Sequence, residues 1–123
     1  MKFLKCEKCG KIVAMVKPSA CDTIMCCGEA MKELVANTVD AAKEKHVPVY
    51  KVNGNTVEVT VGEVNHPMTE EHLIEWIAIE TENGNQRKAL KANDAPKAIF
   101  SLIDGDKVKG VYAYCNLHGL WKA

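Results

Sequence analysis

The stretch from Val47 to Val61 reads VPVYKVNGNTVEVTV and decides the fold of most of this 123-residue chain. Its first half is rich in β-branched residues. Over residues 56–61, apolar and polar residues alternate with the period of a strand that buries one face. Asn53-Gly54-Asn55 separates the halves and is typical of a tight hairpin turn. The sequence therefore predicts two antiparallel strands, 47–52 and 56–61, joined by this turn.

Further short strands of the same kind follow along the chain. The pattern predicts them at 73–81, 86–91, 98–103 and 109–114, with turns at Asn83-Gly84-Asn85 and Asp104-Gly105-Asp106. Only residues 40–45 favour a short turn of helix. Several short strands at this spacing indicate a mostly β protein with an antiparallel β-sandwich.

The composition limits the classes of function. Sixteen basic and 16 acidic residues give a formal net charge of zero, which argues against a nucleic-acid partner or an anionic membrane surface. The apolar stretches are too short to cross a bilayer. The first residues, MKFLKC, lack the apolar run of a signal peptide. We therefore expect a globular cytoplasmic protein.

The six cysteines and four histidines are unevenly placed along the chain. Five cysteines lie between Cys6 and Cys27, whereas every histidine lies at or beyond His46. Two metal-ligand chemistries thus occupy separate regions, which predicts two domains, 1–36 and 37–123, with the boundary near 35–39. The first domain, with possible strands at 12–16 and 31–35, is too short to fold on a hydrophobic core alone. A bound metal would supply the missing stability.

The first cluster combines a spaced pair of cysteines, Cys6 and Cys9, with an adjacent pair, Cys26 and Cys27. Four thiolates favour tetrahedral zinc or iron. Neighbouring residues on an extended chain face opposite ways, so the backbone must bend for both Cys26 and Cys27 to bind one ion. Spacing alone favours structural zinc over iron, and a dithiol or disulfide pair stays open. Cys21 lies outside the pattern and is expected to be an ordinary thiol.

The second cluster consists of four histidines and one cysteine: His46, His66, His72, Cys115 and His118. Each histidine alone is unremarkable, but five nitrogen and sulfur ligands exceed the four of a structural zinc site. Imidazoles with one thiolate suit iron or copper and imply redox work. Four neutral imidazoles and one thiolate leave about +1 charge on a divalent ion, which would attract a small anion. Both tryptophans, Trp76 and Trp121, are expected to serve packing.

The ordered set of motifs resembles desulfoferrodoxin, the two-iron class of superoxide reductase, over nearly the whole chain. The matching segments are Cys6/Cys9, Cys26-Cys27-Gly28-Glu29, Glu44-Lys45-His46-Val47-Pro48, His66-Pro67-Met68 with His72, Ile74-Glu75-Trp76-Ile77, Asp94-Ala95-Pro96 and Cys115-Asn116-Leu117-His118-Gly119. The resemblance implies a desulforedoxin-like domain followed by an immunoglobulin-like β-sandwich.

The resemblance also implies the ligands and the catalytic residues. One iron would be held by Cys6, Cys9, Cys26 and Cys27. A second would have four equatorial histidines and the axial thiolate of Cys115; the histidines are His46, His66, His72 and His118. Superoxide would bind the ferrous ion opposite the sulfur. Glu44 would ligate the ferric ion, and Lys45 would lie near the open face and attract the anion.

The implied activity is the one-electron reduction of superoxide to hydrogen peroxide, with an external rubredoxin-like protein restoring the electron. Members of this class are typically homodimers. Two alternatives stay open on the residues themselves. One is a non-enzymatic iron electron carrier without an open position. The other is a zinc-binding interaction module whose histidines are incidental.

Overall fold

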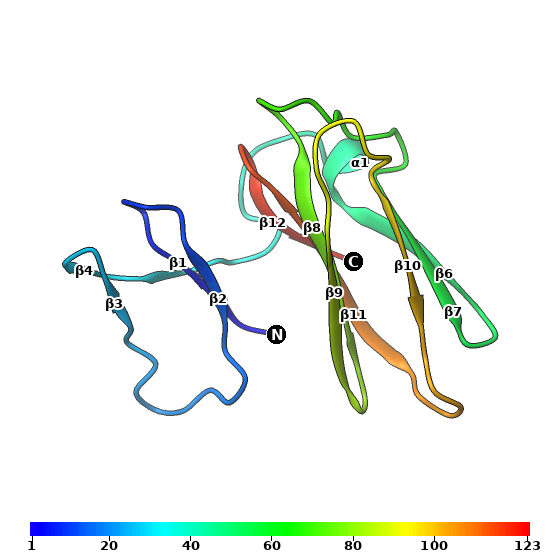
Figure 1. Cartoon of the computed structure of the whole chain (residues 1–123), viewed down its shortest axis with the longest axis horizontal. Coiled ribbons are helices and arrows are strands. Elements are labelled where there is room, and N and C mark those ends of the chain that lie inside the picture. The colour runs from blue at the N-terminus through cyan, green and yellow to red at the C-terminus, as the bar shows by residue number, and fades with distance from the viewer. The chain divides into compact units, whose positions relative to one another are not determined.

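The chain forms two compact units in the computed structural model, which describes residues 1–123 (Figure 1). The first unit spans Met1–Val35 and the second spans Ala36–Ala123. Each unit has its own sheets and its own buried cluster.

The first unit is built from five very short strands. β1 (Phe3–Lys5) lies between β2 (Ile12–Ala14) and β5 (Lys32–Glu33), and β3 (Met25–Cys26) pairs with β4 (Glu29–Ala30). All of these pairs are antiparallel. Its buried cluster contains only Leu4, Cys6 and Met31, with a few half-buried neighbours. This small core agrees with the expectation that a metal stabilises the unit.

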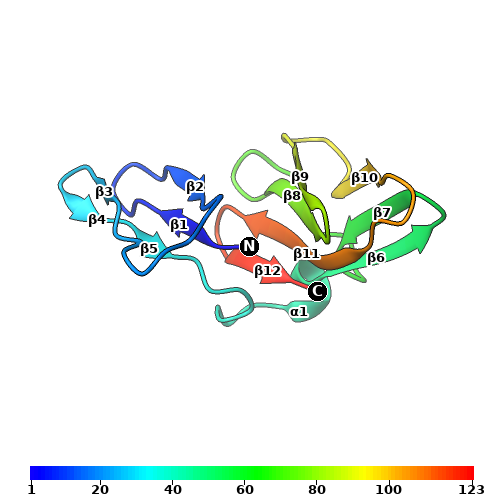
Figure 2. The same ribbon diagram turned by 90° about the horizontal axis from the view of Figure 1, so that it is seen from below.

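The second unit is an antiparallel sandwich of two sheets (Figures 1 and 2). One sheet has the order β10-β7-β6, from Lys97–Ser101, Thr56–Val61 and Pro48–Asn53. The other has the order β12-β11-β8-β9, from Gly119–Lys122, Val108–Cys115, Ile74–Thr81 and Gly84–Ala89. One short helix, α1 (Lys43–His46), precedes β6. The predicted mostly β fold is confirmed.

The sandwich core forms where alternating apolar side chains of the two sheets meet. Val57, Val59 and Val61 of β7 are fully buried, while Glu58 and Thr60 between them are half-buried. The facing sheet contributes Ile77, Ile79, Val111 and Ala113, among others. Burial of these side chains is the main force that closes the sandwich, at roughly 1.5–3 kcal/mol for each large aliphatic residue.

Several element bounds differ from the sequence expectation. The helix occupies Lys43–His46 rather than 40–45, and the strand predicted at 31–35 covers only Lys32–Glu33. The strand β12 and the short strands β1, β3 and β4 were not predicted. These segments are two to four residues long, too short to show a period, and they are strands only because a partner strand pairs with them.

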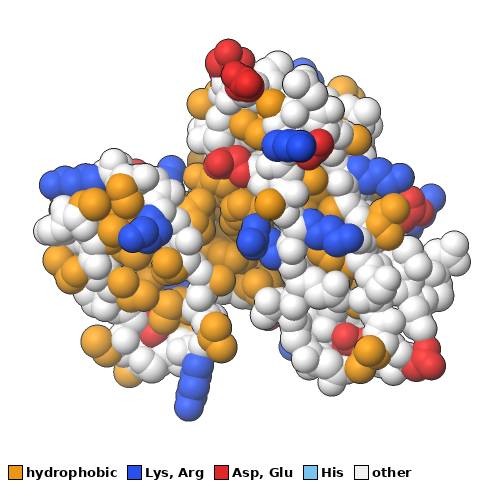
Figure 3. Space-filling view, in the orientation of Figure 1, with side chains coloured by type: hydrophobic (Ala, Val, Ile, Leu, Met, Phe, Trp, Pro, Cys, Tyr) orange, Lys and Arg blue, Asp and Glu red, His pale blue; other side chains and the backbone are white.

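No helix of this structure is long and apolar enough to cross a membrane. On the face shown in Figure 3, Lys and Arg side chains are interspersed with Asp and Glu rather than gathered into one patch. This distribution fits the zero net charge, and this face offers no broad basic surface to a polyanion.

Candidate metal centres

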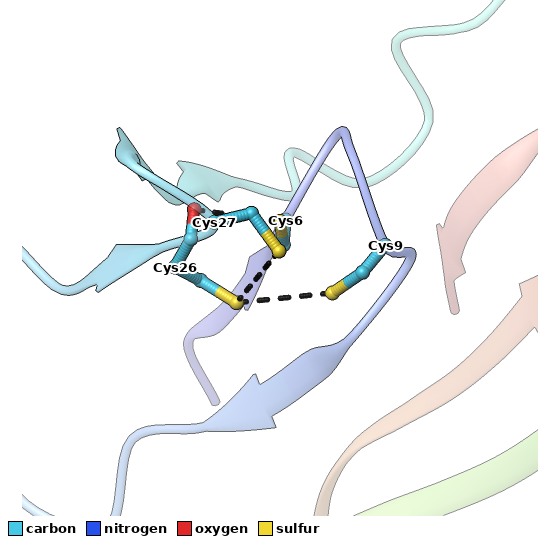
Figure 4. A group of neighbouring side chains, drawn as sticks. All are labelled: Cys6, Cys9, Cys26 and Cys27. Carbon is cyan, nitrogen blue, oxygen red and sulfur yellow. Dashed lines mark hydrogen bonds between the residues drawn. The ribbon is translucent and has the colours of Figure 1, made fainter.

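Four thiols of the first unit converge on one point (Figure 4). The Sγ atoms of Cys6, Cys9, Cys26 and Cys27 all lie within 4.8 Å of one another. Sγ of Cys26 is 3.7 Å from Sγ of Cys9 and 3.9 Å from Sγ of Cys27. Sulfurs about 2.3 Å from a shared tetrahedral ion would be roughly 3.8 Å apart, so this arrangement fits one metal.

The adjacent pair reaches the common point because the backbone turns at Cys27. Its φ is +54°, in the left-handed region that non-glycine residues seldom adopt, and Gly28 follows at φ +78°. The bend required by the Cys26-Cys27 sequence is therefore present. Cys21 is exposed and lies outside the group.

The thiols differ in acidity because their neighbours differ. Backbone N–H groups of Cys9 and Lys8 stabilise the Cys6 thiolate and lower its pKa to about 7, with burial opposing them. Hydrogen bonding with the Cys6 and Cys9 sulfurs raises the pKa of Cys26 to about 12. Four thiolates in one place repel one another, so a cation is needed to hold all of them deprotonated.

The second cluster lies at one end of the sandwich and draws on three stretches of the chain: the end of α1, the loop between β7 and β8, and the turn between β11 and β12. His46 ends α1, His66 lies in the loop after β7, and His72 lies just before β8. Cys115 ends β11, and His118 lies in the turn before β12. The ligand atoms of His46, His66, His72 and Cys115 lie within 4.8 Å of one another.

The strand register brings the segments of His72 and Cys115 together. β8 and β11 pair so that Ile74 is opposite Cys115, with a register shift just before Cys115. Asn116 then joins the two loops: its Oδ1 accepts from the Leu73 N–H at 3.0 Å, and its Nδ2 donates to the Glu71 carbonyl at 3.0 Å. The residue types alone gave no sign of this role for Asn116.

Gly62 allows the segment of His46 to approach the segment of His66. A Cβ at this position would lie 2.4 Å from the Val64 carbonyl oxygen and under 3.0 Å from those of Glu44 and Lys45. The Val64 N–H donates to the Glu44 carbonyl at 3.0 Å, and the Gly62 N–H donates to that of Val47 at 3.2 Å. Only glycine fits this crossing.

The ring orientations of His46 and His66 are fixed by backbone carbonyls. Nδ1 of His46 lies 2.7 Å from the Ala42 oxygen, and Nδ1 of His66 lies 2.7 Å from the Pro67 oxygen. A carbonyl only accepts, so each Nδ1 carries the proton and each neutral ring has a bare Nε2. These two Nε2 atoms are 3.1 Å apart, and two facing lone pairs at that distance call for a cation between them.

The other two histidines complete the ring of nitrogens. Nε2 of His72 is buried and has no hydrogen-bond partner. Nδ1 of His118 lies 3.0 Å from Nε2 of His46 and 3.8 Å from Sγ of Cys115. Neighbouring nitrogens at right angles on an ion, each about 2.1 Å away, would be roughly 3.0 Å apart. The buried Nε2 of His72 without a hydrogen-bond partner, and the nitrogen and sulfur atoms at these distances from one another, fit a bound transition metal.

The electrostatics keep three of these histidines neutral and ready to bind. Burial lowers the pKa of His46 and His72, and it lowers that of His66 to about 4. Repulsion among the rings adds to this effect, and the charge of Lys45 adds to it at His46 and His72. Neutral imidazole is the form that binds a metal.

The thiol of Cys115 is fully buried, and burial raises its pKa. Backbone N–H groups of His118 and Leu117 partly offset this by donating toward the sulfur. Without a metal the group is therefore a thiol at neutral pH, and binding a metal must release its proton.

The two predicted catalytic residues, Glu44 and Lys45, both lie exposed on α1. The Glu44 side chain lines a surface hollow of about 330 Å³ together with Lys43, Val47 and Glu63, and is not among the converging ligand atoms. Lys45 is close enough to His46 and His72 to lower the pKa of both rings, although burial is the larger cause. Glu44 opposes this effect at His46, where its negative charge raises the pKa. Both residues therefore lie close enough to the cluster to act on His46, although neither side chain is among the converging ligand atoms.

Comparison with known proteins gives a consistent result. The family model described as Desulfoferrodoxin matches residues 38–123. The desulfoferrodoxin of Nitratidesulfovibrio vulgaris is 50% identical over 122 residues, covering 99% of this chain and 94% of that protein. A desulfoferrodoxin homolog of Archaeoglobus fulgidus is 46% identical, covering 100% and 96%. The crystal structure of the superoxide reductase from Treponema pallidum is 41% identical, with a TM-score of 0.82 and coverage of 98% of both chains.

Proposed function

Because this chain belongs to the desulfoferrodoxin family, we propose that it is a superoxide reductase with two iron sites. The observation that carries the proposal is the cluster of four histidines and one buried cysteine at the end of the sandwich. Iron bound there would supply the single electron that, with two protons, converts superoxide to hydrogen peroxide. The ligands are His46, His66, His72, His118 and Cys115.

The ligand set favours a small anion as the substrate. A divalent ion with four neutral imidazoles and one thiolate has a net charge of about +1. The low pKa values of His46, His66 and His72 keep the rings neutral, so this charge is not increased by protonation. With His46, His66, His72, His118 and Cys115 as its protein ligands, an iron bound here would have room for the substrate as a further ligand.

Lys45 attracts superoxide to the site in this proposal. Its positive charge lowers the pKa of His46 and of His72, which shows that the charge reaches the cluster. Its side chain is exposed to solvent. The same attraction would speed the approach of an anion, most strongly at low salt. Glu44, which lines the neighbouring hollow with Lys43 and Glu63, would be the residue that ligates the iron in its oxidised resting state.

The buried sulfur of Cys115 would, as a thiolate, donate electron density to a metal bound here. Its sulfur accepts hydrogen bonds from the backbone N–H groups of Leu117 and His118, which moderate that donation. The backbone of the turn would therefore influence how strongly the Cys115 sulfur donates electron density to a metal.

Each of the two predicted domains holds one of the two iron sites in this proposal. Residues 1–36 hold the four-cysteine iron through Cys6, Cys9, Cys26 and Cys27, and residues 37–123 carry out the reduction. An external rubredoxin-like protein supplies the electrons. We further propose a homodimer in the cytoplasm, where reduced thiols can serve as metal ligands.

The product ratio tests the proposed activity. The fully reduced protein is mixed with a known amount of superoxide, and peroxide and oxygen are measured. A reductase yields one hydrogen peroxide for each superoxide consumed and releases no oxygen. A dismutase would yield half as much peroxide together with oxygen, and that result would contradict the proposal.

Two further measurements exclude the other functions. Azide binding to the iron of the histidine cluster distinguishes an open site from an electron carrier without a free position. Metal analysis of protein purified from its native source distinguishes iron from zinc. Zinc at both sites would favour the zinc-binding interaction module and contradict the reductase.

A further inference from the structure

Trp121 contacts two of the histidines in the second cluster through two different parts of its side chain. The indole ring is fully buried and stacks on the His46 ring, with centroids 4.9 Å apart and planes 30° apart. Its Nε1–H donates to the His118 carbonyl at 3.2 Å. The strand β12 holds Trp121 opposite Ala113, deep in the sheet, so the indole itself has little freedom.

Each contact restrains the direction in which a histidine presents its nitrogen. The His46 ring is bonded at Nδ1 to the Ala42 carbonyl and covered on one face by the indole, so its rotation is blocked. The His118 carbonyl belongs to the peptide that leads into Gly119, at φ +79°. Fixing that carbonyl fixes the turn from which the His118 ring projects. The two nitrogens so aimed are 3.0 Å apart.

We propose that Trp121 is a positioning residue of the histidine and cysteine site: its stacking orients His46 and its N–H orients His118. The role rests on the ligand set proposed above, but not on superoxide as substrate. Residues that orient metal ligands typically contribute about 10- to 100-fold to metal affinity. A tryptophan that served packing alone would have no such effect beyond its contribution to folding.

Trp76 provides a matched control. It is 9% exposed, lies on β8, which is separated from β12 by β11 in the same sheet, and stacks on Tyr114 with centroids 5.5 Å apart. It is thus also a buried and stacked indole, and its ring partner is not a proposed ligand.

The experiment measures Co²⁺ binding to the full-length protein, since Co²⁺ reports its coordination through its visible bands. A site with one thiolate and a site with four thiolates absorb differently, so the two sites can be followed separately. We expect Trp121→Leu to lower the Co²⁺ affinity of the histidine site about 10-fold and to shift its bands. Trp121→Phe keeps a stacking ring but loses the N–H, and should restore part of the affinity. Trp76→Leu should change it less than about 2-fold.

Three results would overturn the proposal. If Trp121→Leu and Trp76→Leu lose affinity to the same extent, within about 2-fold, the role of Trp121 is general packing. If Trp121→Phe has wild-type affinity and bands, the N–H contact does not orient His118; this variant decides the matter even if Trp121→Leu does not fold. If the wild-type histidine site binds no Co²⁺, the ligand set fails as well, which separates that failure from a failure of Trp121 alone.

Discussion

The Nε2 atoms of His46 and His66 lie 3.1 Å apart, although Nδ1 of each ring is already bonded to a backbone carbonyl. Neither Nε2 therefore carries a proton to share while the rings are neutral. The fold holds two lone pairs face to face inside a buried cluster, and it keeps them there at a cost in stability. A bound cation would accept both lone pairs and so replace this repulsion by two metal–nitrogen bonds. Protonation of either ring would instead create a positive charge in a buried site, which burial disfavours.

The metal-free protein should become less stable as the pH falls from about 6.5 to about 4. Unfolded histidine titrates near pH 6.5, whereas burial lowers the pKa of His66 to about 4 in the folded state. Between these values the unfolded chain binds more protons, so the free energy of unfolding decreases with decreasing pH. Above about pH 6.5 this contribution is complete and constant. Urea unfolding followed by tryptophan fluorescence reports the second unit, which contains both Trp76 and Trp121.

The variant His66→Gln isolates this contribution, because carboxylates also titrate near the lower end of the range. Its pH dependence should be shallower than that of the wild type between about pH 6 and 5. Equal slopes for the two proteins would show that His66 titrates normally in the folded state.

Gly62→Ala should destabilise the second unit far more than Gly54→Ala. Both glycines have positive φ, +85° and +62°, so both substitutions strain the backbone by about 1–2 kcal/mol. Only at Gly62 does the new methyl group meet three carbonyl oxygens at under 3.0 Å, whereas Gly54 has open space. We expect a total loss of at least about 3 kcal/mol for Gly62→Ala.

The same pair of variants should differ in metal binding. Displacing Glu44 and Lys45 from the loop of His66 moves the His46 nitrogen relative to that of His66. Co²⁺ affinity at this site should therefore fall in Gly62→Ala and stay unchanged in Gly54→Ala. Similar urea midpoints and affinities for the two variants would mean that the crossing at Gly62 tolerates a side chain.

The sequence predicted the sandwich because the alternation over residues 56–61 reports burial on one side, which is a local property. The convergence of the ligands is not local. It depends on the register that places Ile74 opposite Cys115 and on the close crossing at Gly62, neither of which leaves a periodic signal. Trp121 was expected to serve packing because a buried tryptophan has the same sequence signature whether it packs on leucine or on a metal ligand. Its contact could be found only in the structure.

Lys45→Ala should slow the reaction with superoxide about 3- to 10-fold at low ionic strength. The charge of Lys45 acts on two rings of the cluster, whereas Lys43 on the same helix turn lines the surface hollow beside Glu63. Lys43→Ala is therefore the matched control and should change the rate less than about 2-fold. Added salt should reduce the difference between the two variants. Equal rates for Lys45→Ala and wild type at low salt would remove the steering role.

Cys115→Ser should abolish the thiolate-to-iron charge-transfer absorption of the second site. The hydroxyl fits the buried space of the thiol, so folding should be retained. Because burial raises the pKa of Cys115, the wild type should also release one proton from this thiol when the metal binds, and the variant should not. Calorimetry in buffers of different ionisation enthalpy measures that proton. A persisting absorption band would show that Cys115 is not a ligand.

Cys27→Ser should unfold the first unit, whereas Cys21→Ser should leave it intact. Both thiols are exposed, so neither substitution removes much buried apolar surface. Only Cys27 lies in the four-sulfur group, and the buried hydrophobic residues of the unit are few: Phe3, Leu4, Cys6 and Met31. With one thiolate lost, the metal affinity of the site should fall steeply. The population of the folded first unit should fall as well, because metal binding and folding are coupled in units of this size. Limited proteolysis should cut Cys27→Ser within residues 1–35 at a metal concentration that protects Cys21→Ser and wild type. Equal protection of both variants would show that three thiolates suffice, or that the small core folds without a metal.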